Sequence, residues 1–208
     1  MAADSKDRMI RSAYQLFRER GYSGTGFREI SAHSGVAKGA VYHHFPAGKA
    51  DLAEQVIRLA GREVGDLMAA AADGVDPGTL VEGFAAGWAE HVRTHDFAAG
   101  CAIAAVVSES QHDAPQLART AADEFGRWRA ILAESLARQG VPSEHAASLA
   151  TLAVAAVEGA VILARAERAT RPLDDIGREL RKSFEAAVHG ARSSQSKCRD
   201  PAWSVHVE

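Results

Sequence analysis

The sequence has little cysteine and lacks the motifs of common catalytic and metal sites. Its only two cysteines, Cys101 and Cys198, are too few and too far apart for a disulfide framework or a zinc cluster. No C-x-x-C or H-E-x-x-H motif occurs, and we find no Ser-His-Asp constellation, paired-carboxylate arrangement or phosphate-binding glycine loop. We therefore expect no enzyme activity, no bound metal and no organic cofactor.

Long apolar runs are also scarce. The first residues contain no apolar run of signal-peptide type, which favours a cytoplasmic protein. Residues 146–164 are almost all apolar and nearly long enough to cross a membrane. Alanine dominates this stretch, however, and Ser148, Thr151, Glu158 and Gly159 interrupt it. We interpret it as a buried interface helix and expect no membrane partner.

Aromatic residues are few, and no stretch alternates valine, isoleucine, threonine and tyrosine as a strand would. Alanine, the best helix former, is abundant, so the sequence predicts an all-α protein. Apolar spacing and Gly or Pro boundaries predict about nine helices, at residues 5–20, 26–33, 37–44, 49–73, 77–95, 100–110, 115–140, 143–168 and 172–189. Residues 191–208 lack periodicity and are expected to form a flexible tail.

Charge is distributed unevenly along the chain. Residues 1–50 contain eight basic and four acidic residues, whereas residues 51–190 contain thirteen basic and twenty-one acidic ones. A basic N-terminal unit on an acidic body is consistent with a nucleic-acid contact confined to one end. Chance asymmetry over a short segment explains the same numbers, so charge alone does not decide.

Residues 21–52 contain the pattern of a helix-turn-helix, in which the second short helix lies in the major groove of DNA. Gly35 would form the turn, and Lys38 would begin the recognition helix, in reach of a phosphate or a guanine edge. Thr25 is expected to cap the first short helix and bond a phosphate. The residues predicted to contact DNA are Thr25, Lys38, Gly39, Ala40, Tyr42, His43, His44 and Lys49. Two alternatives stay open: Phe45 belongs to the core, and His44 packs under the helix instead of touching DNA.

This segment resembles the DNA-binding domain of the tetracycline-repressor (TetR) family. The matching residues are Gly21, Tyr22, Thr25, Ile30, Gly35, Val36, Lys38, Gly39, Tyr42, His44, Phe45, Lys49 and Leu52. The resemblance implies that Lys38, Tyr42 and Lys49 contact DNA and that Phe45 is core. The chain departs from the family pattern at Ala37, where a capping serine is frequent, and at Gly26, where serine or threonine is common.

The rest of the chain resembles the LmrA/YxaF-like branch of the family, in residues 100–110, 123–140 and 158–167 and in the spacing of FPAGK. The resemblance implies a helix-turn-helix domain over residues 1–48, a ligand-binding and dimerisation domain over 49–190, and the tail at 191–208. Members of this branch are repressors that small, often aromatic effectors release.

An effector would bind between the middle helices of the second domain. The predicted lining residues are Leu67, Met68, Phe84, Trp88, Cys101, Val106, Phe125, Trp128 and Leu132. Aromatic residues at helical spacing are more often core, so each of them has that alternative. His91 and His95 lie one helical turn apart, but without a supporting motif we expect no metal there. Cys101 has no basic neighbour in sequence and is expected to be a buried structural thiol.

The apolar helix at 143–168 needs a second surface to cover it, which predicts a homodimer. The predicted interface residues are Ala153, Ala156, Gly159, Ala160, Leu180 and Phe184. The sequence thus predicts a dimeric repressor that binds a palindromic operator and responds to a small molecule. The alternatives are a regulator that needs no ligand, an activator and, least favoured, an enzyme that uses Glu158.

Overall fold

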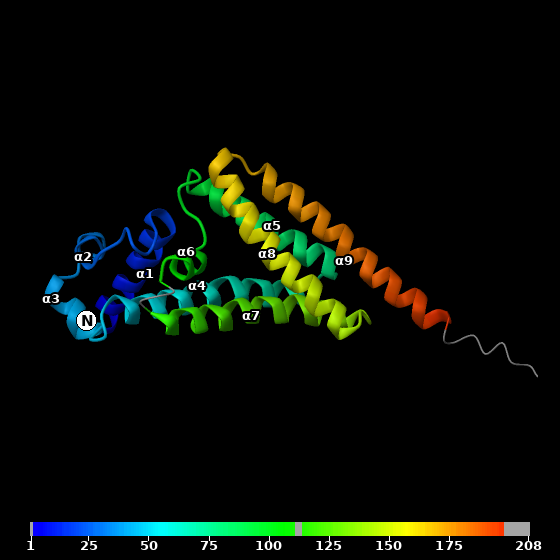
Figure 1. Ribbon diagram of the computed structural model, residues 1–208, viewed down its shortest axis with the longest axis horizontal. Helices are drawn as coiled ribbons and strands as arrows, with labels where there is room; N and C mark the ends of the chain where they lie inside the picture. Colours follow the sequence, from blue (N-terminus) through cyan, green and yellow to red (C-terminus); the bar gives the residue numbers. More distant parts are fainter. Residues whose placement is uncertain (1, 111–113, 198–208) are drawn as a thin grey trace, which may run out of the picture.

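The computed structural model describes residues 2–110 and 114–197, and within these ranges it contains nine helices and no strand (Figure 1). The all-α prediction is therefore confirmed for the described residues. The helices are α1 (Ala2–Arg20), α2 (Phe27–Ser34), α3 (Lys38–His44), α4 (Lys49–Ala72), α5 (Pro77–Thr94), α6 (Ala102–Ser110), α7 (Pro115–Arg138), α8 (Ser143–Glu167) and α9 (Arg171–Lys197).

Helices α1 to α3 form a small group at one end of the molecule, and α4 leads from this group into the larger bundle (Figure 1). The main pairings in the bundle are α5 with α9, α4 with α7, and α7 with α8. Helix α6 lies at the junction, in contact with α1, α4 and α7. One cluster of buried apolar side chains runs through both parts, from Met9 in α1 to Phe184 in α9. The small helical group thus packs on the same core as the bundle.

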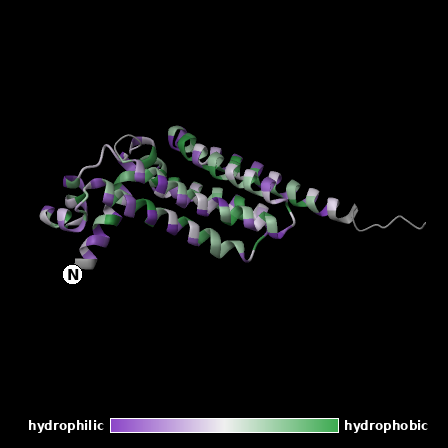
Figure 2. Ribbon diagram, turned by 60° about the horizontal axis from the view of Figure 1, so that its bottom comes forward, coloured by the Kyte–Doolittle hydropathy of each residue, from purple (hydrophilic) through white to green (hydrophobic). Residues whose placement is uncertain are grey.

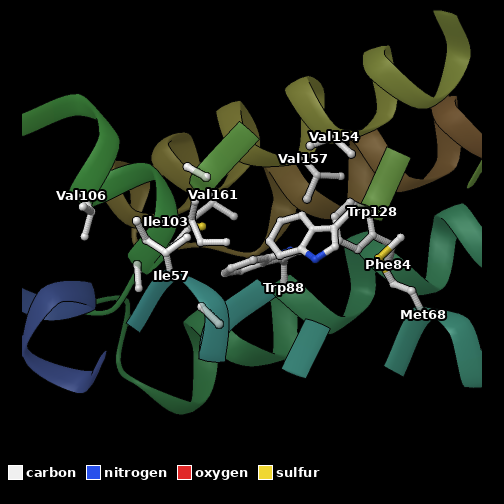
Figure 3. Close-up of a cluster of buried hydrophobic side chains, with 14 of the residues drawn as sticks. Ile57, Met68, Phe84, Trp88, Ile103, Val106, Trp128, Val154, Val157 and Val161 are labelled. Carbon is white, nitrogen blue, oxygen red and sulfur yellow. The ribbon is translucent and has the colours of Figure 1, made fainter. Parts of the chain in front are cut away.

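Trp128 of α7 lies at the centre of the bundle core and is fully buried (Figure 3). Its indole Nε1–H donates a hydrogen bond of 2.9 Å to the carbonyl oxygen of Gly61 in α4. Gly61 also leaves room for the neighbouring Glu124 side chain of α7, because a Cβ at position 61 would lie 2.2 Å from Oε2 of Glu124. Phe84 and Phe125 contact the Trp128 ring edge-on, with centroid distances of 6.1 and 5.3 Å.

The predicted interface on α8 and α9 is wrong for four of its six residues. Ala153, Ala160, Leu180 and Phe184 are buried inside the same chain. The physical reason is that the apolar stripe of α9 packs on α5, while the buried face of α8 packs on α7, α9 and α5. Gly159 is exposed and Ala156 is half-buried, so these two remain available to a partner.

Helix α8 is long and apolar enough to cross a membrane by length and composition alone, and 44% of its most apolar stretch is buried inside the protein. Its outer face exposes Leu152, Ile162 and Leu163, whose exposed fractions are 51%, 66% and 53%. One side of α8 therefore serves the core of its own chain, and the other side is an apolar surface.

The predicted tail begins too early. Helix α9 continues to Lys197, so residues 191–197 are helical, and residues 198–208, with Cys198, lie outside the described part. Polar side chains satisfy the backbone here, since the hydroxyl of Ser194 donates to the carbonyl oxygen of Gly190 at 3.0 Å. Arg192 also donates to Oε1 of Gln139 at 2.6 Å, which fixes the helix to the end of α7. Apolar periodicity does not detect such a polar extension.

Buried Cys101 and half-buried Glu158 form a polar pair between α8 and the start of α6. Burial raises the pKa of the Cys101 thiol well above its usual value, as does the nearby carboxyl of Glu158. The prediction of a buried thiol is confirmed. Burial also raises the pKa of Glu158 to about 7, although the thiol donates a hydrogen bond to this carboxyl. Within the described residues, Oε1 of Glu158 has no hydrogen-bond partner.

This raised pKa predicts a loss of stability with rising pH. Because the pKa of Glu158 is higher in the folded than in the unfolded chain, its contribution is complete below about pH 4.5 and disappears as pH rises through 7. Between pH 4.5 and 8, the free energy of unfolding of the wild type should fall by about 3 kcal/mol relative to Glu158→Gln. Urea unfolding at several pH values measures this difference, with Glu167→Gln, an exposed change on the same helix, as control. Parallel pH curves for wild type and Glu158→Gln would contradict the assignment.

Candidate nucleic-acid interface

Helix α2 begins at a different residue from the one that the sequence indicates. Gly26 is its N-cap, and the carboxylate of Glu29 accepts the Gly26 N–H at 3.0 Å. The predicted cap by Thr25 is wrong, since this side chain is fully buried and its hydroxyl donates to the carbonyl oxygen of Gly21 at 2.9 Å. Thr25 stabilises the end of α1 and does not belong to the exposed surface.

The turn and helix α3 are held from below. Gly35 adopts a φ of +66°, a left-handed conformation that glycine tolerates best, and ends α2. Val41 and Phe45 are fully buried beneath α3, which confirms Phe45 as core. Ala37 is the N-cap of α3, and its methyl side chain cannot accept a hydrogen bond from the first backbone N–H groups of the helix. The helix is therefore held by burial of one face and not by capping.

The opposite face of α3 is open to solvent. Lys38, Gly39, Tyr42 and His43 are exposed, and Ala40 is half-buried. The Tyr42 side chain is 59% exposed and rests edge-on against Phe27, with ring centroids 5.8 Å apart. A Cβ added at Gly39 would meet no atom within 4 Å, so a DNA backbone or base could approach here. Hydrophilic residues cover much of this end of the molecule (Figure 2).

Two predicted contact residues have partners inside the protein. The His44 ring is hydrogen-bonded through Nε2 to the hydroxyl of Ser5 in α1 at 2.8 Å. Lys49 donates to the carbonyl oxygen of Tyr22, and its ammonium lies 4.1 Å from the centre of the Tyr22 ring. Partial burial lowers the pKa of Lys49, while Glu109 and Glu29 oppose this shift. Both side chains lie at the edge of the exposed face instead of at its centre.

Links to the bundle support the loop between α1 and α2. The carboxylate of Glu109 in α6 accepts the backbone N–H of Ser23 at 2.6 Å. The backbone N–H of Gly100 donates to the carbonyl oxygen of Arg18 at 3.0 Å. The sequence analysis missed Glu109, because no local pattern pairs residues that lie 86 positions apart.

Comparison with known proteins identifies this arrangement. Residues 9–56 match the model of bacterial regulatory proteins of the tetR family, and residues 77–179 match the model of the LmrA/YxaF-like transcriptional regulator C-terminal domain. An HTH-type transcriptional regulator of Mycobacterium tuberculosis is 36% identical over 189 residues, covering 88% of this chain and 95% of its own length. The chain belongs to the TetR family of transcriptional regulators. This TetR-family protein belongs to the LmrA/YxaF-like branch and is a DNA-binding regulator, not an enzyme.

Further relatives agree with this assignment. The HTH-type regulator YxaF of Bacillus subtilis is 29% identical over 171 residues, which cover 82% of this chain and 90% of YxaF. The crystal structure of a TetR regulator from Legionella pneumophila has a TM-score of 0.77 at 20% identity, covering 86% of this chain and 96% of that one. This structural likeness shows the fold of the TetR-family protein, a helix-turn-helix unit followed by a helical domain.

A cavity of about 500 Å³ lies between α1, α4 and α5. Four of the nine predicted lining residues border it: Leu67, Met68, Phe84 and Trp88. The other five are placed elsewhere. Cys101, Val106, Trp128 and Leu132 are buried in the core, and Phe125 packs half-buried against Trp128. Tyr14, Arg18, Glu63 and His91 add a polar end that the sequence analysis did not include.

His91 and His95 stack with ring centroids 4.5 Å apart. Within residues 2–110 and 114–197, no group of three or more His, Cys, Asp or Glu side chains is arranged to hold a metal ion. The expectation that the protein binds no metal stays a prediction. The pair instead contacts Arg18 and Trp88 at the polar end of the cavity.

Substitutions on the exposed face of α3 should weaken DNA binding with little effect on the fold. Tyr42→Ala should reduce operator affinity by about 1–3 kcal/mol, since a hydrogen bond to a charged phosphate has that magnitude. Lys38→Ala should also reduce the slope of log affinity against log salt by about one for each phosphate that the variant no longer neutralises. The unfolding free energy of Lys38→Ala should stay within about 0.5 kcal/mol of wild type. That of Tyr42→Ala should fall by about 1 kcal/mol, because the variant loses the edge-on contact with Phe27.

Fluorescence anisotropy with labelled operator DNA at several salt concentrations measures both effects. Lys182→Ala, which removes an exposed lysine on α9, is the control for net charge. If Lys38→Ala and Lys182→Ala had the same effect, Lys38 would act through net charge and not through contact.

Proposed function

We propose that the protein is a homodimeric repressor that binds a palindromic operator and dissociates from it when a small hydrophobic or aromatic molecule enters the cavity. One observation carries the proposal: α1 and α4 both reach from the helix-turn-helix to the walls of the cavity. A molecule that alters the position of either helix would alter the position of α3. We expect the protein to work in the cytoplasm, where a bacterial operator lies.

The dimer is supported by the outer face of α8. Leu152, Ile162 and Leu163 together expose a continuous apolar strip, since they lie at helical spacing on one side of the helix. Gly159 and the half-buried Ala156 lie on the same side, and their small side chains allow close helix packing. A second copy of α8 covers such a strip, and the resulting twofold axis would present two α3 helices to two half-sites.

The effector is supported by the walls of the cavity. Most of the lining side chains are apolar, and the aromatic rings of Phe84 and Trp88 face a space large enough for a drug-sized molecule. Leu67 lines the cavity and is 73% exposed. A planar or flexible apolar molecule would remove this side chain from water.

Release of DNA would follow from a shift between two positions of the recognition helices. Helix α4 begins beside the helix-turn-helix at Lys49, and its second half, around Met68, forms a wall of the cavity. A molecule that binds best when α4 is tilted would change the distance between the two α3 helices of the dimer. The two α3 helices would then no longer match the spacing of the two half-sites, and operator affinity would fall.

Filling the cavity tests the effector role. Gly87 faces open space on α5, so Gly87→Leu should occupy the cavity while it also raises helix propensity. In a gel shift with the promoter beside its own gene, wild-type protein should bind and be released by some apolar compounds of a panel. Gly87→Leu should bind equally well but need at least about tenfold more compound for release, roughly 1.4 kcal/mol.

Gly190→Leu is the matched control, because Gly190 also faces open space but lies on α9, away from the cavity. A protein that shifts the promoter but ignores every compound would be the ligand-independent regulator of the alternative. Expression of a reporter then separates a repressor from an activator.

The α8 strip yields a separate prediction. Ile162→Arg should convert the dimer to a monomer in sedimentation velocity, because a buried unpaired charge costs several kcal/mol in an apolar interface. Operator affinity should fall with it, since a monomer meets one half-site only. Ala130→Arg, on the exposed side of α7, should leave both properties unchanged. A wild-type protein that sediments as a monomer at micromolar concentration would disprove the dimer.

A further inference from the structure

The cavity is elongated and has one apolar and one polar end. On α5 its wall is formed by Thr79, Gly83, Gly87 and His91, which repeat every four residues and so follow one face of the helix. The twelve residue steps from Thr79 to His91 correspond to about 18 Å of helix. A Cβ added at Gly83 or Gly87 would meet no atom within 4 Å, so the cavity is open along this face. Its shape fits a long, narrow molecule.

Two buried polar atoms without a partner belong to residues that line the polar end of the cavity. They are Nε of Arg18 and Nε2 of His91, and neither has a hydrogen-bond partner within the described part of the protein. Buried polar atoms are nearly always hydrogen-bonded, so two such atoms on the wall of one cavity indicate a place for a polar group.

The guanidinium of Arg18 is held in a fixed orientation. It lies over the Tyr14 ring, 4.4 Å from its centre, and its Nη2 is 3.3 Å from Nε2 of His95. Nδ1 of His95 lies 2.8 Å from the carbonyl oxygen of His91, which can only accept a hydrogen bond. Nδ1 therefore carries the proton, and Nε2 accepts from Arg18. The Nε–H of Arg18 is left for another acceptor.

The positive charge of Arg18 lacks a carboxylate partner. Across residues 4–110 and 114–194, no Asp or Glu oxygen pairs with Arg18 within 4.0 Å. Glu63, the acid on the cavity wall, is 3.7 Å from Arg11 and lies close enough to Tyr14 to help raise the pKa of its hydroxyl. His91 adds no charge at neutral pH, because burial, Arg18 and His95 together lower its pKa to about 4. One uncompensated cation therefore remains at this end.

We propose that the cavity binds an elongated apolar carboxylate, whose alkyl or aryl body lies between α4 and α5 and whose carboxylate accepts the Nε–H of Arg18 beside His91. This inference rests on the proposed role of the cavity as the effector site and specifies the chemical class of the effector. A monoanion balances the single charge of Arg18, and a guanidinium binds a carboxylate by geometry as well as by charge. The ligand would then contact α1, a helix of the DNA-binding unit, directly.

A matched pair of probes tests the charge requirement. Decanoate and decan-1-ol have the same chain and differ in the charged end group. In titration calorimetry at pH 7.5, the wild type should bind decanoate at least about tenfold more tightly than decan-1-ol. Arg18→Gln should reduce decanoate binding to the level of the alcohol and leave alcohol binding unchanged. Arg20→Gln removes an exposed arginine from the same helix outside the cavity and should preserve the preference.

The possible results distinguish the proposal that the cavity binds a carboxylate from the broader proposal that it binds an effector. Equal binding of the two probes to the wild type would overturn the carboxylate proposal, and the effector cavity would stand if the alcohol still released the operator. Retention of the preference in Arg18→Gln would overturn the role of Arg18, provided that circular dichroism shows a folded variant. Failure of both probes to bind would overturn the carboxylate proposal, and the gel shift with the compound panel would then decide the effector role separately. The comparison of decanoate with decan-1-ol on the wild-type protein tests the carboxylate proposal even if Arg18→Gln does not fold.

Discussion

Helix α1 is the element on which both ends of the molecule depend. The recognition helix α3 has seven residues, too few to be stable by itself in water, and its N-cap Ala37 has no side-chain cap. It holds its shape because Val41 and Phe45 are buried in the core that α1 helps to form. Ser5 of α1 is hydrogen-bonded to His44 at the end of α3, and Lys6 lies 5.8 Å from the centre of the Phe45 ring. The DNA contacts predicted for the open face of α3 would all rely on this support.

The other end of the same helix reaches the bundle. Tyr14 and Arg18 line the cavity, and the carbonyl oxygen of Arg18 accepts the N–H of Gly100 just before α6. Glu109 of α6 reaches back to the loop after α1. A molecule in the cavity would therefore act on α1 and α6 as well as on α4. In the proposed mechanism, the tilt of α4 and a displacement of α1 are two consequences of one binding event, and α3 responds to both.

Local sequence patterns predicted most of the fold, and long-range contacts explain where they failed. Apolar spacing with glycine and proline boundaries placed all nine described helices, and the spaced match from Gly21 to Leu52 identified the family. Thr25 was misassigned because a hydroxyl that precedes a helix can turn forward to cap it or backward to α1, and only the packing decides. The apolar stripe that contains Leu180 and Phe184 has the same sequence pattern whether it packs inside the chain or against a second copy. Only the folded structure shows that it packs on α5. Arg18 and His91 lie far apart in the sequence and meet only through folding, so no sequence window contains the polar end of the cavity.

The central claim is that two copies of α3 enter the major groove of one operator, and methylation protection tests it most directly. Dimethyl sulfate modifies guanine N7 in the major groove and adenine N3 in the minor groove. A dimer with both α3 helices in the major groove should protect guanine N7 atoms in two tracts related by a twofold axis, and adenine N3 atoms between the tracts should stay reactive. Protection in the minor groove alone, or in a single unsymmetrical tract, would contradict it.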